Sequence, residues 1–189
     1  MSAVKAAGRM IGWCRAVPAR AGYALGCLLY DPDRALALSS ERLGRIPGNL
    51  GVYARQAFYR RVLSQVGMDV HFGFMSLLSK RGSRIGDRVY IGRFCTLGWV
   101  DIGPDAMLAD GVQVLSGRHQ HGREAADGQP MRQQAQRFEQ VRIGAGAWLG
   151  AGAVVMADVG EHAIVAAGAV VVRPVEAGAR VAGVPARAI

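Results

Sequence analysis

The chain has 189 residues, of which 51% are hydrophobic and 26 are glycines, and its formal net charge is +9. The apolar content excludes a disordered chain, and the length fits one core domain with an appendage. The positive charge is typical of proteins that bind nucleic acid, an anionic membrane or a polyphosphate-bearing substrate. Because no nucleic-acid-binding motif accompanies the charge, we expect no nucleic acid partner.

Residues 1–67 are predicted to form a basic α-helical region. The pattern from residue 4 to about 30 indicates a helix that Pro18 kinks or splits, and it contains no uncharged stretch long enough to span a membrane. It fits a helix lying on a bilayer, with Trp13 and Tyr23 at the interface. It fits equally a helix packed across the end of the core domain or against a partner subunit.

Two further helices are predicted in this region, a short one around residues 35–43 and a longer one over about residues 50–66. We expect the longer helix to cover the end of the core domain, because an uncovered β-structure would expose unpaired backbone groups there.

Cysteine usage indicates a reducing compartment. Cys14, Cys27 and Cys95 are widely spaced and form no C-x-x-C pair, and no signal-peptide cleavage pattern is present. We therefore predict no disulfides and a cytoplasmic protein.

The core domain, residues 68–189, is marked by aliphatic residues that recur about every six positions. Neither a helix nor an alternating strand has this spacing, since their apolar periods are 3.6 and 2. A six-residue unit that turns one corner per repeat does have it, and the predicted fold is a parallel β-helix. The spacing from Leu97 to Ile102 is five, which predicts one tightened corner. The repeating aliphatic residues are Ile85, Ile91, Leu97, Ile102, Leu108, Val114, Ile143, Leu149 and Val155.

Small or apolar residues often follow four places after each aliphatic position, and Cys95 is one of them. We therefore interpret Cys95 as an inward packing residue and not as a nucleophile. Residues 118–140, in contrast, are polar and carry no hexad, which predicts an extruded loop. A loop of this length in a compact domain is commonly functional.

The hexads, together with the ending AGVPAR at residues 182–187, resemble the hexapeptide-repeat acyltransferases. The resemblance covers residues 68–189 and is closest to the sugar O-acetyltransferases of exopolysaccharide and O-antigen biosynthesis. It implies an all-β core wound as a left-handed parallel β-helix with three hexads per turn. It also implies a homotrimer, because the donor groove of the family lies between adjacent subunits.

The same resemblance assigns catalysis to His119, which follows the element Ser116-Gly117-Arg118. Imidazole titrates near neutral pH, so it can take a proton from an acceptor hydroxyl and pass it to the departing thiolate. His121 and Arg118 are assigned to acceptor binding or orientation, although His121 could merely occupy the loop and Arg118 could be solvated. The acid that orients His119 is left open among Asp101, Asp110 and Glu139.

For the donor, the resemblance implies acetyl-CoA and no metal. Trp148 matches a tryptophan that lines the groove near the thioester, and the N–H of Ala151 is a candidate oxyanion donor. Small residues allow close approach of the pantetheine, and basic residues occupy the positions that contact the nucleotide phosphates in the family. The residues assigned to donor binding are Trp148, Ala151, Ala167, Gly168, Arg173 and Arg187.

The resulting hypothesis is direct acetyl transfer in a ternary complex to a sugar hydroxyl, in surface or extracellular polysaccharide biosynthesis. The acceptor would be a sugar, a nucleotide-sugar or a lipid-linked glycan, with residues 1–30 available for contact with the inner face of the cytoplasmic membrane. One alternative is a serine or other small-molecule O-acetyltransferase. Two more are a γ-type carbonic anhydrase, which needs three histidine ligands, and a non-enzymatic structural β-helix, which leaves the setting of His119 unexplained.

Overall fold

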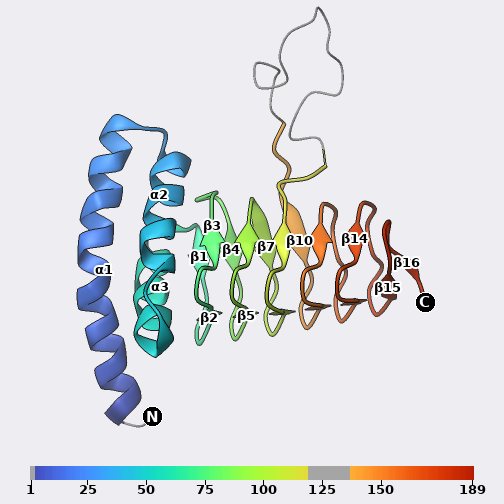
Figure 1. Cartoon of the computed structure of the whole chain (residues 1–189), viewed down its shortest axis with the longest axis horizontal. Coiled ribbons are helices and arrows are strands. Elements are labelled where there is room, and N and C mark those ends of the chain that lie inside the picture. Colours follow the sequence, from blue (N-terminus) through green and yellow to red (C-terminus); the bar gives the residue numbers. More distant parts are fainter. Residues whose placement is uncertain (1–2, 119–136) are drawn as a thin grey trace, which may run out of the picture.

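A computed structural model describes residues 3–118 and 137–189 of the chain. Helices α1 (Ala3–Leu29), α2 (Pro32–Gly44) and α3 (Gly48–Val62) lie across one end of a prism of short strands, and the C-terminus lies at the other end (Figure 1). Helix α1 continues through Pro18 as one element, so of the two effects expected of Pro18, a kink or a split, the split does not occur.

The strands form three parallel sheets, one on each side of the prism. Sheet A contains β1 (Gln65–Val66), β4 (Arg84–Ile85), β7 (Val100–Ile102) and β10 (Val141–Ile143). Sheet B contains β2 (His71–Phe72), β5 (Tyr90–Ile91), β8 (Met107–Leu108), β11 (Trp148–Leu149), β13 (Ile164–Val165), β15 (Arg180–Ala182) and β16 (Arg187–Ala188). Sheet C contains β3 (Leu77–Leu78), β6 (Thr96–Leu97), β9 (Gln113–Val114), β12 (Val154–Val155) and β14 (Val170–Val171).

This architecture confirms the predicted left-handed parallel β-helix of hexapeptide repeats. The chain visits the sheets in the order A, B, C in the first four coils, and after β12 isolated parallel bridges at Val159 and Val175 replace the strands of sheet A. Each strand pairs in parallel with the equivalent strand of the next coil, apart from the antiparallel pair of β15 and β16. The first strand, β1, begins at Gln65, so the coils start soon after α3 ends at Val62.

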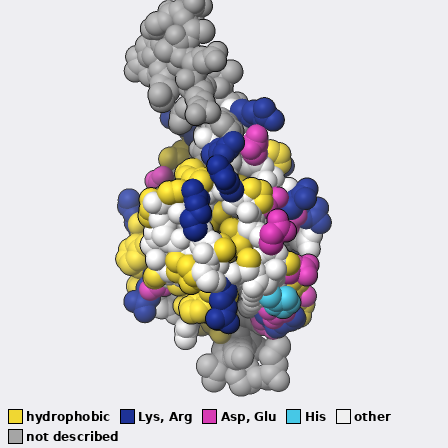
Figure 2. Space-filling view, turned by 90° about the vertical axis from the view of Figure 1, so that its right-hand side faces the viewer, with side chains coloured by type: hydrophobic (Ala, Val, Ile, Leu, Met, Phe, Trp, Pro, Cys, Tyr) yellow, Lys and Arg dark blue, Asp and Glu magenta, His cyan; other side chains and the backbone are white. Residues whose placement is uncertain are grey.

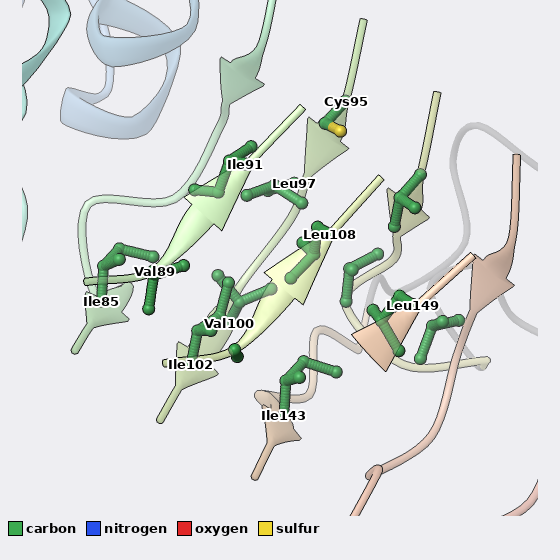
Figure 3. Close-up of a cluster of buried hydrophobic side chains, with 14 of the residues drawn as sticks. Ile85, Val89, Ile91, Cys95, Leu97, Val100, Ile102, Leu108, Ile143 and Leu149 are labelled. Atoms are coloured by element: carbon green, nitrogen blue, oxygen red, sulfur yellow. The ribbon is translucent and has the colours of Figure 1, made fainter. Parts of the chain in front are cut away.

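The hexad residues fill the inside of the prism (Figure 3). Ile85 pairs in register with Ile102, and Leu108 pairs with Leu149, so equivalent side chains stack along the axis. All nine predicted aliphatic residues are at most 1% exposed. Such stacking removes nearly all of their apolar surface from water, at about 25 cal/mol per Å².

The tightened corner between Leu97 and Ile102 is confirmed. Here Gly98 and Trp99 alone join β6 to β7, and the N–H of Trp99 donates to the hydroxyl of Ser116 in the next coil at 2.8 Å. A Cβ on Gly98 would lie 2.4 Å from that Ser116 oxygen, so only glycine fits. Ser116 therefore has a structural role as well as its place before the loop.

The N-terminal helices close the first coil, as expected for α3. The buried hydroxyl of Ser40 in α2 hydrogen-bonds the hydroxyl of Tyr59 in α3 at 2.6 Å and accepts the N–H of Leu78 in β3 at 3.0 Å. Arg55 of α3 is fully buried and donates to the carbonyl of Phe72 in β2 at 3.1 Å. Backbone groups at the end of the prism are therefore paired by side chains of the helices.

Helix α1 packs on the outside of α2 and α3 through small residues. A Cβ on Gly12 would lie 2.4 Å from Cβ of Tyr53 in α3, and Ala16 is fully buried. Helix α1 therefore packs within the N-terminal region, on α2 and α3, and these two helices lie between it and the end of the core (Figure 1). Within residues 3–118 and 137–189, no helix combines the length and apolar content required to cross a bilayer.

Cys95 points into the prism and is fully buried, which confirms its interpretation as a packing residue. Burial raises the pKa of the Cys95 thiol to about 11. At about pH 8 only on the order of one thiol in a thousand is then ionised, and the thiolate is the reactive form. We expect iodoacetamide to alkylate the exposed Cys14 and to leave Cys95 unmodified in the native protein, as read by peptide mass spectrometry. Equal labelling of both cysteines without denaturant would contradict this burial.

Candidate active site

The two ends of the predicted loop are fixed side by side where sheet C turns into sheet A. The N–H of Glu139 donates to the carbonyl of Ser116 at 3.0 Å, and the N–H of Val141 donates to the carbonyl of Trp99 at 2.9 Å. Gly117 has a φ of +79°, which favours glycine, and a Cβ there would lie 2.9 Å from Glu139. His119 and His121 lie outside the described residues.

A cleft of about 480 Å³ lies on one side of these loop ends, and we call it the loop-base cleft. Arg118, Glu139 and Arg173 line it together with Asp158. The guanidinium of Arg118 reaches the carbonyl of Val172 at 3.5 Å, so two cations assigned separately from the sequence share one cleft. Of the three acids left open as partners of His119, Glu139 lines this cleft, and its carboxylate pairs with Arg137 at 3.1 Å.

A second hollow lies on the other side of the loop ends, between the start of α2 and sheet C. It consists of two adjoining parts of about 450 and 320 Å³ that share Asp33, Lys80 and Phe138, and we call it the α2 cleft. The ammonium of Lys80 lies 3.1 Å from the carboxylate of Asp33 and 3.9 Å from the ring centre of Phe138. Ser116 and Trp99 also line this cleft.

The sequence interpretation did not single out any residue of the α2 cleft as functional. Lys80 and Asp33 are far apart in the chain, and they meet only because α2 packs against sheet C. Phe138 stands at the end of a polar segment that has no repeat to fix its orientation. The sequence did contain one signal for Phe138, because an aromatic residue at the end of a polar loop often packs against the domain from which the loop extends.

Most of the predicted donor residues lie at a different corner, where sheet B turns into sheet C. The N–H of Gly168 donates to the carbonyl of Ala151 at 2.9 Å, so these small residues occupy stacked positions in successive coils. Trp148 projects outward from β11 and is 49% exposed, as the narrow interior led us to expect. Ala167 precedes Gly168 at the same corner.

The N–H of Ala151 differs in its hydrogen bonding from the equivalent group in an earlier coil. In an earlier coil, the equivalent N–H of Arg93 donates to the carboxylate of Asp110 at 2.8 Å. The coil after Ala151 carries Ala167 instead of an acid at that place, and among the described residues the N–H of Ala151 has no hydrogen-bond partner. An N–H without a partner inside the chain can donate to a carbonyl or an oxyanion.

Arg187 lies in β16 at the C-terminal end of the prism and is exposed. The neighbouring N–H of Ala186 donates to the carbonyl of Val170 at 2.8 Å, which attaches this ending to the start of β14. Arg187 is therefore close to the corner of Ala167 and Gly168. Arg173, six residues beyond Ala167, is one corner further on, in the loop-base cleft.

The basic side chains on the C-terminal end of the prism stand apart from one another, with acidic ones between some of them (Figure 2). The basic side chains that the view shows at this end therefore form separate groups and not one continuous basic surface.

Two of the histidines belong to the described residues. The ring of His71 in β2 stacks on Tyr90 with centres 4.7 Å apart, and its pKa is lowered by burial and by Arg55. His162 precedes β13, four strands along sheet B, so the two histidines are separated by roughly 19 Å at about 4.8 Å per strand. They cannot share a metal ion, and residues 3–118 and 137–189 contain no group of three or more potential metal ligands.

Comparisons with known proteins agree with this fold. Residues 140–173 match the family model described as hexapeptide repeat of succinyl-transferase. No curated protein matches the sequence at a significant level. Among solved structures, a maltose O-acetyltransferase from Clostridium difficile 630 superposes with a TM-score of 0.71 and 19% identity, covering 85% of this chain and 88% of that one.

Two further solved structures are similar. A hexapeptide-repeat acetyltransferase from Vibrio cholerae has a TM-score of 0.67 and 20% identity, with 85% of this chain and 92% of that one covered. A galactoside acetyltransferase in complex with coenzyme A has a TM-score of 0.65 and 18% identity, with 85% and 82% covered. The stacked hexads, the match over residues 140–173 and these superpositions together show that the chain has the left-handed β-helix fold that these acetyltransferases share.

Proposed function

We propose that this protein is an acetyl-CoA-dependent O-acetyltransferase that acts on a sugar hydroxyl. One observation carries the proposal: the ends of the loop that contains His119 are anchored between two clefts. Gly117 and Arg118 line the loop-base cleft on one side, and Ser116 and Phe138 line the α2 cleft on the other. A base that follows Arg118 directly is suited to act on a hydroxyl held beside either cleft.

In the proposed reaction, the imidazole of His119 accepts the proton of the acceptor hydroxyl as its oxygen attacks the thioester carbon. The C–O bond forms, and negative charge develops on the carbonyl oxygen, where the N–H of Ala151 is available to donate. The C–S bond then breaks, and the thiolate of coenzyme A takes the proton from the imidazolium. No covalent acyl-enzyme is needed, and the buried thiol of Cys95 is not suited to form one.

Donor binding is proposed along the corner where sheet B turns into sheet C. The galactoside acetyltransferase of this fold was solved with coenzyme A, which supports a coenzyme A donor here. Ala167 and Gly168 leave room for the pantetheine chain, and the exposed face of Trp148 can pack against it. Arg187, and Arg173 at the next corner, would meet the phosphates. No metal is required.

A homotrimer is proposed because the assigned residues lie on two corners of one prism. In a closed three-fold assembly with parallel axes, the loop-base corner of one copy can face the donor corner of the next. The site would then combine His119, Arg118 and Arg173 of one copy with Trp148 and Ala151 of its neighbour.

The acceptor is proposed to be a sugar, a nucleotide-sugar or a lipid-linked glycan of surface polysaccharide biosynthesis in the cytoplasm. Two proteins of the same fold are named for maltose and galactoside acetylation, which supports a sugar. The α2 cleft offers aromatic rings of Trp99 and Phe138 beside the charged pair of Asp33 and Lys80, a combination suited to the apolar face and hydroxyls of a sugar ring. A small-molecule acceptor such as serine would leave most of this cleft unfilled.

Acetyl transfer is tested by incubating the protein with acetyl-CoA and a panel of maltose, galactosides, UDP-sugars and serine. Thiol release gives the rate, and NMR of the product identifies the acetylated oxygen. We expect transfer to at least one sugar hydroxyl and none to serine. Transfer to serine alone would overturn the sugar assignment, and failure to bind coenzyme A by calorimetry would overturn the enzyme assignment.

A further inference from the structure

Helix α1 has two faces of opposite character. The face toward α2 and α3 is made of small residues, and it fits closely: a Cβ on Gly8 would lie 2.6 Å from the ring of Tyr53, and one on Gly26 would lie 3.1 Å from Cβ of Ala35. These glycines allow the backbone of α1 to approach the helices beneath it. Tyr23 also lies on this face, with its ring centre 6.0 Å from that of Phe58 in α3, whereas most other bulky side chains of α1 point the other way.

The opposite side, which we call the outer face of α1, is apolar and exposed. Leu28 is 80% exposed, Met10 is 67% exposed and Leu25 is 59% exposed. Among the side chains that the structure describes, half of the exposed large hydrophobic residues lie between Met10 and Tyr30. Single exposed apolar residues are ordinary on a protein surface, whereas such a concentration indicates a binding surface. The outer face consists of Met10, Ile11, Trp13, Cys14, Val17, Leu25, Leu28 and Leu29.

The charged residues of α1 indicate which kind of partner its outer face binds. Residues 1–30 contain Lys5, Arg9, Arg15 and Arg20 and no aspartate or glutamate. Arg20 lies at the border of the outer face, with its guanidinium 5.9 Å from the ring centre of Trp13. A tryptophan beside a cation suits the headgroup region of a bilayer. Pairing of two α1 helices would instead bring together two segments whose charged residues are all positive, and charge repulsion disfavours this.

The position of α1 leaves the outer face accessible. Helix α1 forms the outermost layer at the N-terminal end of the molecule, with α2 and α3 between it and the coils (Figure 1). Its outer face therefore points away from the prism along the prism axis. In the proposed three-fold assembly, three such faces would lie in one plane at the same end.

We propose that the outer face of α1 binds the surface of an anionic lipid bilayer, with the prism standing on its N-terminal end. The leucines and Trp13 enter the boundary between headgroups and acyl chains, and the guanidinium of Arg20 meets lipid phosphates. Because each helix contributes modest affinity, simultaneous contact by several copies would strengthen attachment. This inference goes beyond acetyl transfer, since it holds or fails independently of the reaction.

The test is sedimentation of the full-length protein with vesicles of phosphatidylcholine containing phosphatidylglycerol, compared with phosphatidylcholine alone. We expect binding to the anionic vesicles that weakens with added salt. The double substitution Leu25→Ser with Leu28→Ser should lower the partition constant by roughly tenfold or more, because two apolar side chains no longer enter the bilayer. Arg20→Ala should weaken binding to anionic vesicles only.

The matched control is Phe94→Ser, which removes a side chain that is 57% exposed on the prism, away from α1. It should bind vesicles as the original protein does, and circular dichroism with size-exclusion chromatography checks that every variant is folded. Equal sedimentation of the original protein and the Leu25/Leu28 variant would overturn the proposal. Absence of vesicle binding, with a larger assembly that the same substitutions dissociate, would overturn it too, since a second copy would then cover the face.

Discussion

Replacing His119 by alanine is expected to lower kcat for acetyl transfer by about 10²–10⁴-fold, the range that a positioned general base contributes. The acceptor hydroxyl would still bind, but no group would take its proton as the C–O bond forms. Affinity for coenzyme A should stay nearly unchanged, because the residues proposed to hold the donor lie around Trp148 and Ala151. Thiol-release kinetics measure the first effect, and titration calorimetry measures the second.

His121→Ala is the matched control for this prediction, because it removes a second imidazole from the same segment. Its effect should fall mainly on KM for the acceptor if His121 contacts that substrate, and it should be small if His121 only occupies the loop. Unchanged turnover of the His119→Ala variant would remove the general-base assignment. The fold and the donor site could still stand after such a result.

Replacing Arg55 by alanine is expected to lower the free energy of unfolding by about 3–5 kcal/mol. Its guanidinium donates to the carbonyls of Phe72 at 3.1 Å and of Leu43 and Ile46 at 2.9 Å each. The substitution would leave these carbonyls without that donor and open a cavity between the helices and the first coil. Burial lowers the pKa of Arg55, so the site already holds its charge at a cost, and the hydrogen bonds offset that cost.

Chemical denaturation followed by circular dichroism measures this effect. Arg61→Ala, an exposed position on the same helix, should change stability by no more than about 0.5 kcal/mol. Similar stabilities for the two variants would show that Arg55 does not hold the cap to the coils. Because α1 rests on α2 and α3, loss of this anchor should also weaken vesicle binding by the full-length protein.

The assigned site could be predicted from the sequence only in part. The outward direction of Trp148 follows from its place beside the inward Leu149, because neighbouring strand residues face opposite sides. The sequence also indicated that Arg173 and Ala167 lie at different corners of the prism, because six residues carry the chain from one corner to the next. The resemblance grouped both with the donor, and the structure shows that Arg173 lines the same cleft as Arg118.

The α2 cleft could not be predicted, because it depends on how a helix docks. Asp33 meets Lys80 only after α2 has packed against sheet C, and no periodic pattern fixes the angle of that packing. For α1, the sequence indicated an amphipathic basic helix but left two roles open. The structure shows which face packs inside the protein, because the glycine face fits Tyr53 closely and the bulky apolar face remains exposed.

By itself, the sequence determined the β-helix, its inward residues and its shortened corner, since each repeat is local and contacts mainly the coil before and after it. It also determined where the repeat stops and the polar segment begins. Only the tertiary structure decided which corners carry the assigned residues, which face of α1 is buried and which clefts flank the loop. These depend on contacts between segments that are distant in the chain, and such contacts are fixed by the shape and packing of whole elements and not by the period of one segment.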